Sequence, residues 1–201
     1  MSSTDATRPR MFRAGDGPVS TWSVPNLISI VRIVLVPVFV LVLLAGADGG
    51  AVRWIATALF VVAISTDSLD GHLARSRNLV TDLGKILDPI ADKALTGAAL
   101  VVLWVIGELP WWVMLPILVR EVGITVWRFA VLSKRVIPAS KGGKTKTVLQ
   151  SVAIGLALAP LPALLGSWMN QVNAVFMAAA FVVTILTGIQ YLVDDRRLNR
   201  G

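Results

Sequence analysis

Six long apolar stretches dominate this chain and constrain its fold more than any other feature. Each has about the 20 mostly apolar residues that a helix needs to cross a bilayer. The connections between them are short and carry glycine, proline or charged residues, as turns do. The apolar runs are continuous and do not alternate with polar residues, which favours helices over membrane strands. The six predicted spans are Pro25–Ala45, Ala51–Leu69, Ile86–Ile106, Leu109–Leu132, Thr147–Leu165 and Val172–Val193.

The composition supports this prediction. Hydrophobic residues make up 55% of the 201 residues and charged residues only 15%, against about 25% charged in soluble domains. The mean hydropathy is +0.74. Because the chain has no cysteine and one histidine, disulfides, thiolate nucleophiles and zinc sites built from Cys or several His are excluded. The expected fold is an all-α integral membrane protein, a bundle of six transmembrane helices.

The charge distribution predicts the orientation of the bundle. Residues 1–24 form a polar tail or interfacial segment, 25–195 the transmembrane region, and 196–201 a basic end. With six spans both termini lie on one side, and that side carries nearly all of the Lys and Arg residues outside the spans, against Arg53 on the other. Cytoplasmic loops are enriched in such residues, so we expect a multi-pass protein of the cell (inner) membrane with cytoplasmic termini. A net charge of +7 suits either nucleic acid or an anionic membrane surface, and the apolar composition favours the membrane. The basic residues on the cytoplasmic side are Arg8, Arg10, Arg13, Arg75, Arg77, Lys85, Lys134, Arg135, Lys141, Lys144, Lys146, Arg196, Arg197 and Arg200.

Four aspartates at the cytoplasmic ends of the second and third spans are the strongest functional signal. Asp67 and Asp70 are three residues apart, and Asp88 and Asp92 are four apart, so each pair shares one helix face. Two consecutive helices joined by a short loop can bring all four carboxylates together. Four such charges need cations, and hard oxygen ligands suit Mg²⁺ or Mn²⁺. The alternative is that they only pair with nearby basic residues such as Lys93.

This segment resembles the signature of the CDP-alcohol phosphatidyltransferases, D-x2-D-G-x2-A-R-x8-G-x3-D-x3-D. Every fixed position is met, by Asp67, Asp70, Gly71, Ala74, Arg75, Gly84, Asp88 and Asp92. The resemblance implies that 25–195 is the catalytic domain and that the four aspartates hold two divalent cations. It implies a CDP-linked lipid donor bound by Asp67, Asp70, Gly71, Ala74, Arg75 and Gly84. Asp92 would also be the catalytic base, and the active site would face the cytoplasm.

A second set of basic residues bears on the acceptor alcohol. Arg120 and Arg128 lie two turns apart inside the apolar run 109–132, and a lysine-rich loop follows. Such cations suit a phosphate, although positive-inside bias or a structural Arg120–Glu121 pair also explains part of the pattern. The segments 24–32, 120–121 and 141–150 resemble the branch of the family that uses sn-glycerol 3-phosphate as acceptor and CDP-diacylglycerol as donor. The expected acceptor-phosphate residues are Arg120, Arg128, Lys141, Lys144 and Lys146.

Other functions stay open at this point. A cardiolipin synthase of the same family would use phosphatidylglycerol as acceptor. A cation transporter would place its carboxylates near the bilayer midplane and show inverted repeats, neither of which the sequence indicates. A non-catalytic membrane scaffold would not need the complete motif. The resemblance also implies a homodimer, on which the sequence itself is silent.

Overall fold

The computed structural model describes residues 24–76, 82–132 and 141–198. Within these ranges the residues form seven α-helices and no strand, which confirms the all-helical prediction. The helices are α1 (Val24–Ala45), α2 (Gly50–Ser76), α3 (Asp82–Val105), α4 (Trp111–Leu132), α5 (Lys141–Leu158), α6 (Leu161–Leu165) and α7 (Trp168–Leu198). The side chains of 24–25, 67–76, 82–83, 85, 128–132, 141–145, 192 and 194–198 lie outside the description. The predicted tail 1–24 also lies outside it, apart from the backbone of Val24.

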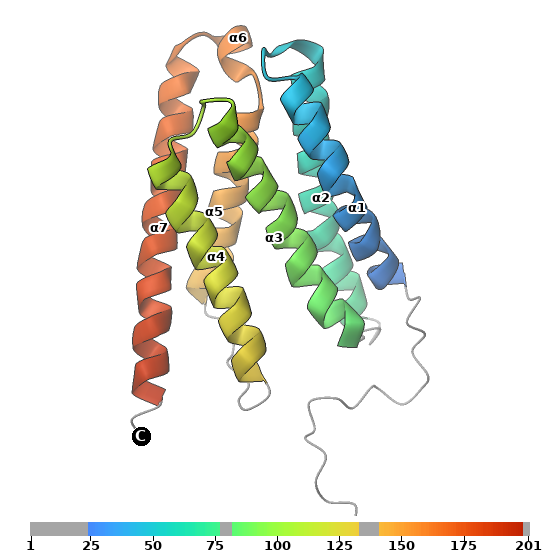
Figure 1. The fold of residues 1–201 in the computed structure, drawn as a ribbon, viewed down its shortest axis with the longest axis vertical. Coiled ribbons are helices and arrows are strands. Elements are labelled where there is room, and N and C mark those ends of the chain that lie inside the picture. Colours follow the sequence, from blue (N-terminus) through green and yellow to red (C-terminus); the bar gives the residue numbers. More distant parts are fainter. Residues whose placement is uncertain (1–23, 77–81, 133–140, 199–201) are drawn as a thin grey trace, which may run out of the picture.

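The long helices run alternately up and down (Figure 1). The start of α1 and the end of α7 lie at the same end of the bundle, together with the ends of α2 and α4 and the starts of α3 and α5. We call this the motif end, because the aspartate motif lies there. The short helix α6 and the α1–α2 and α3–α4 turns lie at the opposite end. Helix α1 packs on α2 and α3, while α7 packs on α5 and α4.

The helix ends follow local chemistry. Gly107 has a φ of 81°, and the Glu108 N–H donates to the Leu103 carbonyl at 2.9 Å, which is the hydrogen bond of a Schellman C-cap. The single predicted span 147–165 is wrong at its C-terminal part. Helix α5 ends at Leu158 and α6 begins at Leu161, because Pro160 lacks an N–H and the residue before a proline avoids the helical region.

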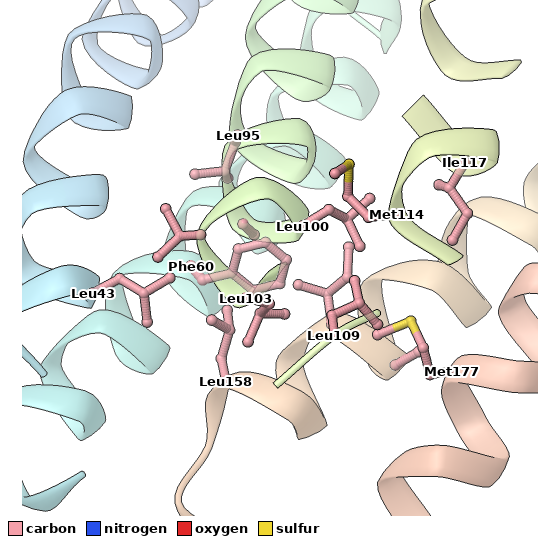
Figure 2. Packing of buried hydrophobic residues seen from close by; sticks show 14 of the residues in the cluster. Leu43, Phe60, Leu95, Leu100, Leu103, Leu109, Met114, Ile117, Leu158 and Met177 are labelled. Atoms are coloured by element: carbon pink, nitrogen blue, oxygen red, sulfur yellow. The ribbon is translucent and has the colours of Figure 1, made fainter. Parts of the chain in front are cut away.

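Buried apolar side chains from several helices form one hydrophobic core, part of which Figure 2 shows. Phe39 of α1 and Phe60 of α2 are fully buried, with ring centroids 6.0 Å apart. Leu95 and Leu103 of α3 and Leu158 of α5 join the same cluster. Ile117 of α4 and Met177 of α7 also belong to it, so the core joins all six long helices.

Much of the outer surface of the bundle is apolar. Among the residues that the structure describes, two helical segments, Asn26–Ala45 and Trp168–Tyr191, are long and apolar enough to cross a membrane. Only 22% and 17% of these segments are buried inside the protein, unlike the core helix of a soluble protein. Large side chains such as Leu41 and Val119 are more than 60% exposed. Exposed apolar area on this scale indicates contact with lipid or other apolar surfaces.

Candidate active site

Asp88 and Asp92 lie one helical turn apart near the start of α3 and share one of its faces. The side chains of both are partly exposed, so their oxygens are accessible. The Ser29 hydroxyl of α1 donates a short hydrogen bond to Oδ1 of Asp88. Ser29 is buried where α1 packs on α3, and this contact fixes the orientation of the Asp88 carboxylate.

The first half of the motif lies on α2, which is antiparallel to α3 and in contact with it. The backbones of Asp67, Asp70, Gly71, Ala74 and Arg75 belong to the last turns of this helix. Their side chains lie outside the described residues, so the convergence of four carboxylates stays a prediction. Gly84, the sixth donor-binding residue predicted, is buried in the first turn of α3.

Among the described side chains, no three His, Cys, Asp or Glu residues form a group that could hold a metal ion. This set leaves out Asp67 and Asp70. The donors that the structure does describe, Asp88 and Asp92, offer carboxylate oxygens one turn apart. Hard cations such as Mg²⁺ bind such oxygens and not the nitrogen and sulfur ligands that zinc prefers. The described half of the motif therefore fits a hard divalent cation.

A buried cluster of charges lies beside Asp92. We call it the Glu121 cluster: Lys93, Arg120, Glu121 and Lys146. Oε2 of Glu121 lies 2.7 Å from Lys93 Nζ, and Oε1 lies 2.9 Å from Arg120 Nη1 and also contacts Lys146 Nζ. Lys93 Nζ in turn lies 2.8 Å from Oδ2 of Asp92. The cluster thus joins α3, α4 and α5 and reaches the aspartate motif.

The Glu121 cluster is rich in basic groups. Lys93, Arg120 and Lys146 supply three basic side chains, and Glu121 with Asp92 supplies two carboxylates. Glu121 and Lys146 are almost completely buried, at 4% and 1% exposure. An anion bound among these basic groups would receive charge-assisted hydrogen bonds, so the cluster suits an anionic ligand. The structure brings together two of the predicted acceptor residues, Arg120 and Lys146, and adds Lys93, which the sequence had placed beside the aspartates.

Helix α7 completes the surroundings of Arg120. Thr187 Oγ1 accepts a hydrogen bond from Arg120 Nη2 at 3.2 Å. A Cβ on Gly188 would lie 3.2 Å from Arg120 Cγ, so the glycine leaves room for the stem of the arginine. Thr187 and Gly188 of α7 thus contact Arg120 in addition to Glu121.

The other predicted acceptor residues are placed only by their backbones. Arg128 lies toward the end of α4, and Lys141 and Lys144 lie in the first turns of α5. Their side chains are outside the description, so their part in the site stays a prediction. All three lie at the motif end of the bundle (Figure 1).

Sequence reasoning did not identify three residues that shape the site: Ser29, Thr187 and Gly188. It did single out Glu121, because a charged residue inside an apolar run is costly and is a functional candidate. It did not place Glu121 among the acceptor-phosphate residues. Ser29, Thr187 and Gly188 are ordinary residues of apolar helices, and only the packing of α1 on α3 and of α4 on α7 gives them a role.

The fold and the site together are those of an all-helical, membrane-associated protein that gathers carboxylates and basic side chains at one end of its helices. A family model described as CDP-alcohol phosphatidyltransferase matches residues 22–186. The chain therefore belongs to the CDP-alcohol phosphatidyltransferase family, and it is an enzyme.

Curated relatives agree with this assignment. The chain is 47% identical over 173 residues to a "Probable phosphatidylglycerophosphate synthase" of Mycobacterium tuberculosis, covering 86% of this chain and 81% of that protein. It is 37% identical over 182 residues to the "CDP-diacylglycerol--glycerol-3-phosphate 3-phosphatidyltransferase" of Bacillus subtilis, covering 85% and 93%. A protein of the same name from Shigella flexneri is 37% identical over 185 residues, covering 87% and 96%.

Proposed function

We propose that this enzyme transfers the phosphatidyl group of CDP-diacylglycerol to sn-glycerol 3-phosphate, giving phosphatidylglycerophosphate and CMP. The names of the relatives point to these substrates. The observation that carries the proposal is the gathering of three basic side chains in the Glu121 cluster, directly beside Asp92. An acceptor that bears a phosphate can bind there and present its hydroxyl group to the aspartate motif. Phosphatidylglycerol, the acceptor of a cardiolipin synthase, remains the second candidate.

The membrane arrangement is part of the proposal. Helices α1–α5 and α7 would make six spans of the cell (inner) membrane, with residues 25–195 as the transmembrane catalytic domain. The motif end would face the cytoplasm, because the loops and termini there carry the Lys and Arg residues. A water-soluble acceptor and the released CMP could then exchange with the cytoplasm. A homodimer is proposed on the resemblance alone.

Asp67, Asp70, Asp88 and Asp92 would hold Mg²⁺ or Mn²⁺, two ions by the family resemblance, and the family is generally metal-dependent. When bound, the ions would neutralise negative charge on the transferring phosphate and on the leaving nucleotide. The chain's own contribution is to hold the carboxylates in place. Ser29 does so for Asp88.

Asp92 would act as the general base. It would take the proton from the acceptor hydroxyl group, whose oxygen forms a bond to the phosphorus bonded to diacylglycerol. The bond from that phosphorus to the oxygen of CMP breaks, and CMP leaves. Asp67, Asp70, Gly71, Ala74, Arg75 and Gly84 would bind the donor. Gly84 lies eight residues before Asp92 on α3, so the backbone that would approach the donor and the proposed base belong to the same helix.

The experiment that tests the reaction uses the full chain purified in detergent. We expect CMP release to require CDP-diacylglycerol, sn-glycerol 3-phosphate and Mg²⁺ together, and removal of the metal with EDTA to abolish it. An acceptor panel should contain sn-glycerol 3-phosphate, phosphatidylglycerol, inositol and inositol phosphate. Preferential use of phosphatidylglycerol would contradict the proposal and favour the cardiolipin synthase reaction.

The acceptor site predicts a selective kinetic defect. Removing a cation that binds the acceptor phosphate, by Arg120→Ala or Lys146→Ala, should raise the KM for sn-glycerol 3-phosphate about tenfold or more, because a charge-assisted hydrogen bond contributes roughly 1.5–3 kcal/mol. The KM for CDP-diacylglycerol should change little.

Arg128→Ala, Lys141→Ala and Lys144→Ala test the rest of the predicted set in the same assay. Arg135→Ala also removes one positive charge, but Arg135 is not one of the predicted acceptor residues, so this variant serves as the control. An unchanged acceptor KM in both Arg120→Ala and Lys146→Ala would contradict this site.

A further inference from the structure

Glu121 is the common partner of the three cations in the Glu121 cluster. We propose that Glu121 is a positioning residue: it sets the spacing of Lys93, Arg120 and Lys146 so that together they receive the acceptor phosphate. The inference rests on the proposed function, because it assigns a role within the acceptor site. It concerns a residue that would touch neither the substrate nor the reacting atoms.

The contacts of the Glu121 carboxylate divide between its two oxygens. Oε1 accepts from Arg120 Nη1 at 2.9 Å and from Lys146 Nζ, and Oε2 lies 2.7 Å from Lys93 Nζ. Each cation comes from a different helix: α4, α5 and α3, respectively. Side-chain exposure of Glu121 is 5%, so water cannot replace these contacts. The positions of the three cations relative to one another therefore depend on this one carboxylate.

A purely structural ion pair would not need this arrangement. One basic partner is enough to neutralise a buried carboxylate, and three basic groups at one carboxylate repel one another when all of them are charged. A bound dianionic phosphate would offset that repulsion, and Glu121 holds the three basic groups around the position that the phosphate would occupy.

The cluster is also connected to the proposed base. Lys93 bridges Glu121 Oε2 and Asp92 Oδ2, at 2.7 and 2.8 Å. On the other side, Thr187 holds Arg120 at 3.2 Å. Glu121 thus fixes both where the acceptor phosphate binds and how far that position lies from Asp92. This predicts an effect on acceptor binding first and on turnover second.

Glu121→Gln separates positioning from simple charge. If only the charge balance mattered, removing a carboxylate would leave more positive charge and tighten binding of sn-glycerol 3-phosphate. If Glu121 positions the cations, the acceptor KM should instead rise at least about tenfold, while the KM for CDP-diacylglycerol stays within about twofold. Glu121→Asp keeps the charge but is shorter by one methylene, so it should show an intermediate rise and partly rescue the defect.

Binding can be measured without turnover. Stabilisation of the detergent-purified enzyme against heat by sn-glycerol 3-phosphate alone, without donor, should be present in the wild type and reduced in Glu121→Gln. The matched control is Glu108→Gln, which removes a carboxylate that pairs with an arginine at the α6 end and should leave both KM values unchanged. If Glu121→Gln does not fold, Glu121→Asp provides both measurements.

The outcomes are distinguishable. A higher acceptor KM together with reduced stabilisation by the acceptor supports the inference. An unchanged or lower acceptor KM in a folded Glu121 variant overturns it, as does an equal change in the KM values of donor and acceptor. In these cases the wild type still converts sn-glycerol 3-phosphate and the proposed function stands. If the wild type does not use sn-glycerol 3-phosphate at all, the proposed function fails, and this inference fails with it.

Discussion

Replacing Asp92 by asparagine is expected to lower the kcat for CMP release by about 10²–10⁴-fold, which is the range that a positioned general base contributes. The amide has nearly the same size as the carboxylate but cannot take the proton of the acceptor hydroxyl group. Asp92 is partly exposed and lies one turn from Asp88, so the substitution removes a reactive group without opening a cavity in the core. The measurement is CMP release at saturating donor, acceptor and Mg²⁺.

Comparison with two other variants separates the base from the metal ligands. Asp92→Asn should keep metal-dependent binding of CDP-diacylglycerol measurable, because Asp67, Asp70 and Asp88 would be the main ligands of the cations and all three remain. Asp88→Asn removes one of these main ligands and should weaken this binding more. Asp48→Asn, an exposed aspartate at the α6 end, should behave as the wild type. More than about a tenth of the wild-type activity in Asp92→Asn would show that the base is another group.

The sequence predicted much of the fold because the apolar runs are local and long. Five of the six predicted spans correspond to single helices, α1, α2, α3, α4 and α7. The predicted boundaries were less accurate where a helix continues into polar sequence, since α2 extends to Ser76 and α5 begins at Lys141. An apolar run marks where a helix meets the core or a lipid phase, and the helical hydrogen bonds do not end with that run.

Within the site, the sequence could predict only how residues of the same helix lie relative to one another. Asp88 and Asp92 share a face of α3 because they are four residues apart, and this follows from helix geometry alone. The partners of Glu121 come from α3 and α5, and the partner of Asp88 comes from α1. Such contacts depend on how the helices pack and at what depth they face one another. A single sequence carries no direct signal for either.

Arg53 shows the same limit at the other end of the bundle. The sequence presented it as the isolated basic residue of the outer side, yet it is buried, with 3% exposure. Its Nε donates to the carbonyl of Leu158 at 2.7 Å and its Nη2 to that of Ala157 at 3.2 Å. These are carbonyls of the last turn of α5, which have no partner within a helix. Nη2 also lies 2.5 Å from Glu108 Oε2, in the α3–α4 turn.

Arg53→Ala should therefore lower the free energy of unfolding by about 2–4 kcal/mol, because it leaves two helix-end carbonyls and a carboxylate without their donor. Arg53→Lys should cost less, since it keeps the charge but loses the planar fork that reaches several acceptors. Glu108→Gln should cost about 1 kcal/mol or less, because the Glu108 side chain is 42% exposed and its charge is solvated. The measurement is SDS-induced or thermal unfolding in detergent.

This loss of stability should leave the chemistry intact. Along α3, the α3–α4 turn lies about 20 Å from Asp92 at a rise of about 1.5 Å per residue, so Arg53 contacts nothing at the motif end. Below its unfolding temperature, Arg53→Ala should keep the wild-type KM values for both substrates. Val52→Ala, at an exposed position of the same turn of α2, is the control for truncation alone. Equal stability of Arg53→Ala and Val52→Ala would mean that the arginine does not hold α2, α5 and the α3–α4 turn together. A raised acceptor KM in Arg53→Ala would mean that the two ends of the bundle are coupled through the core.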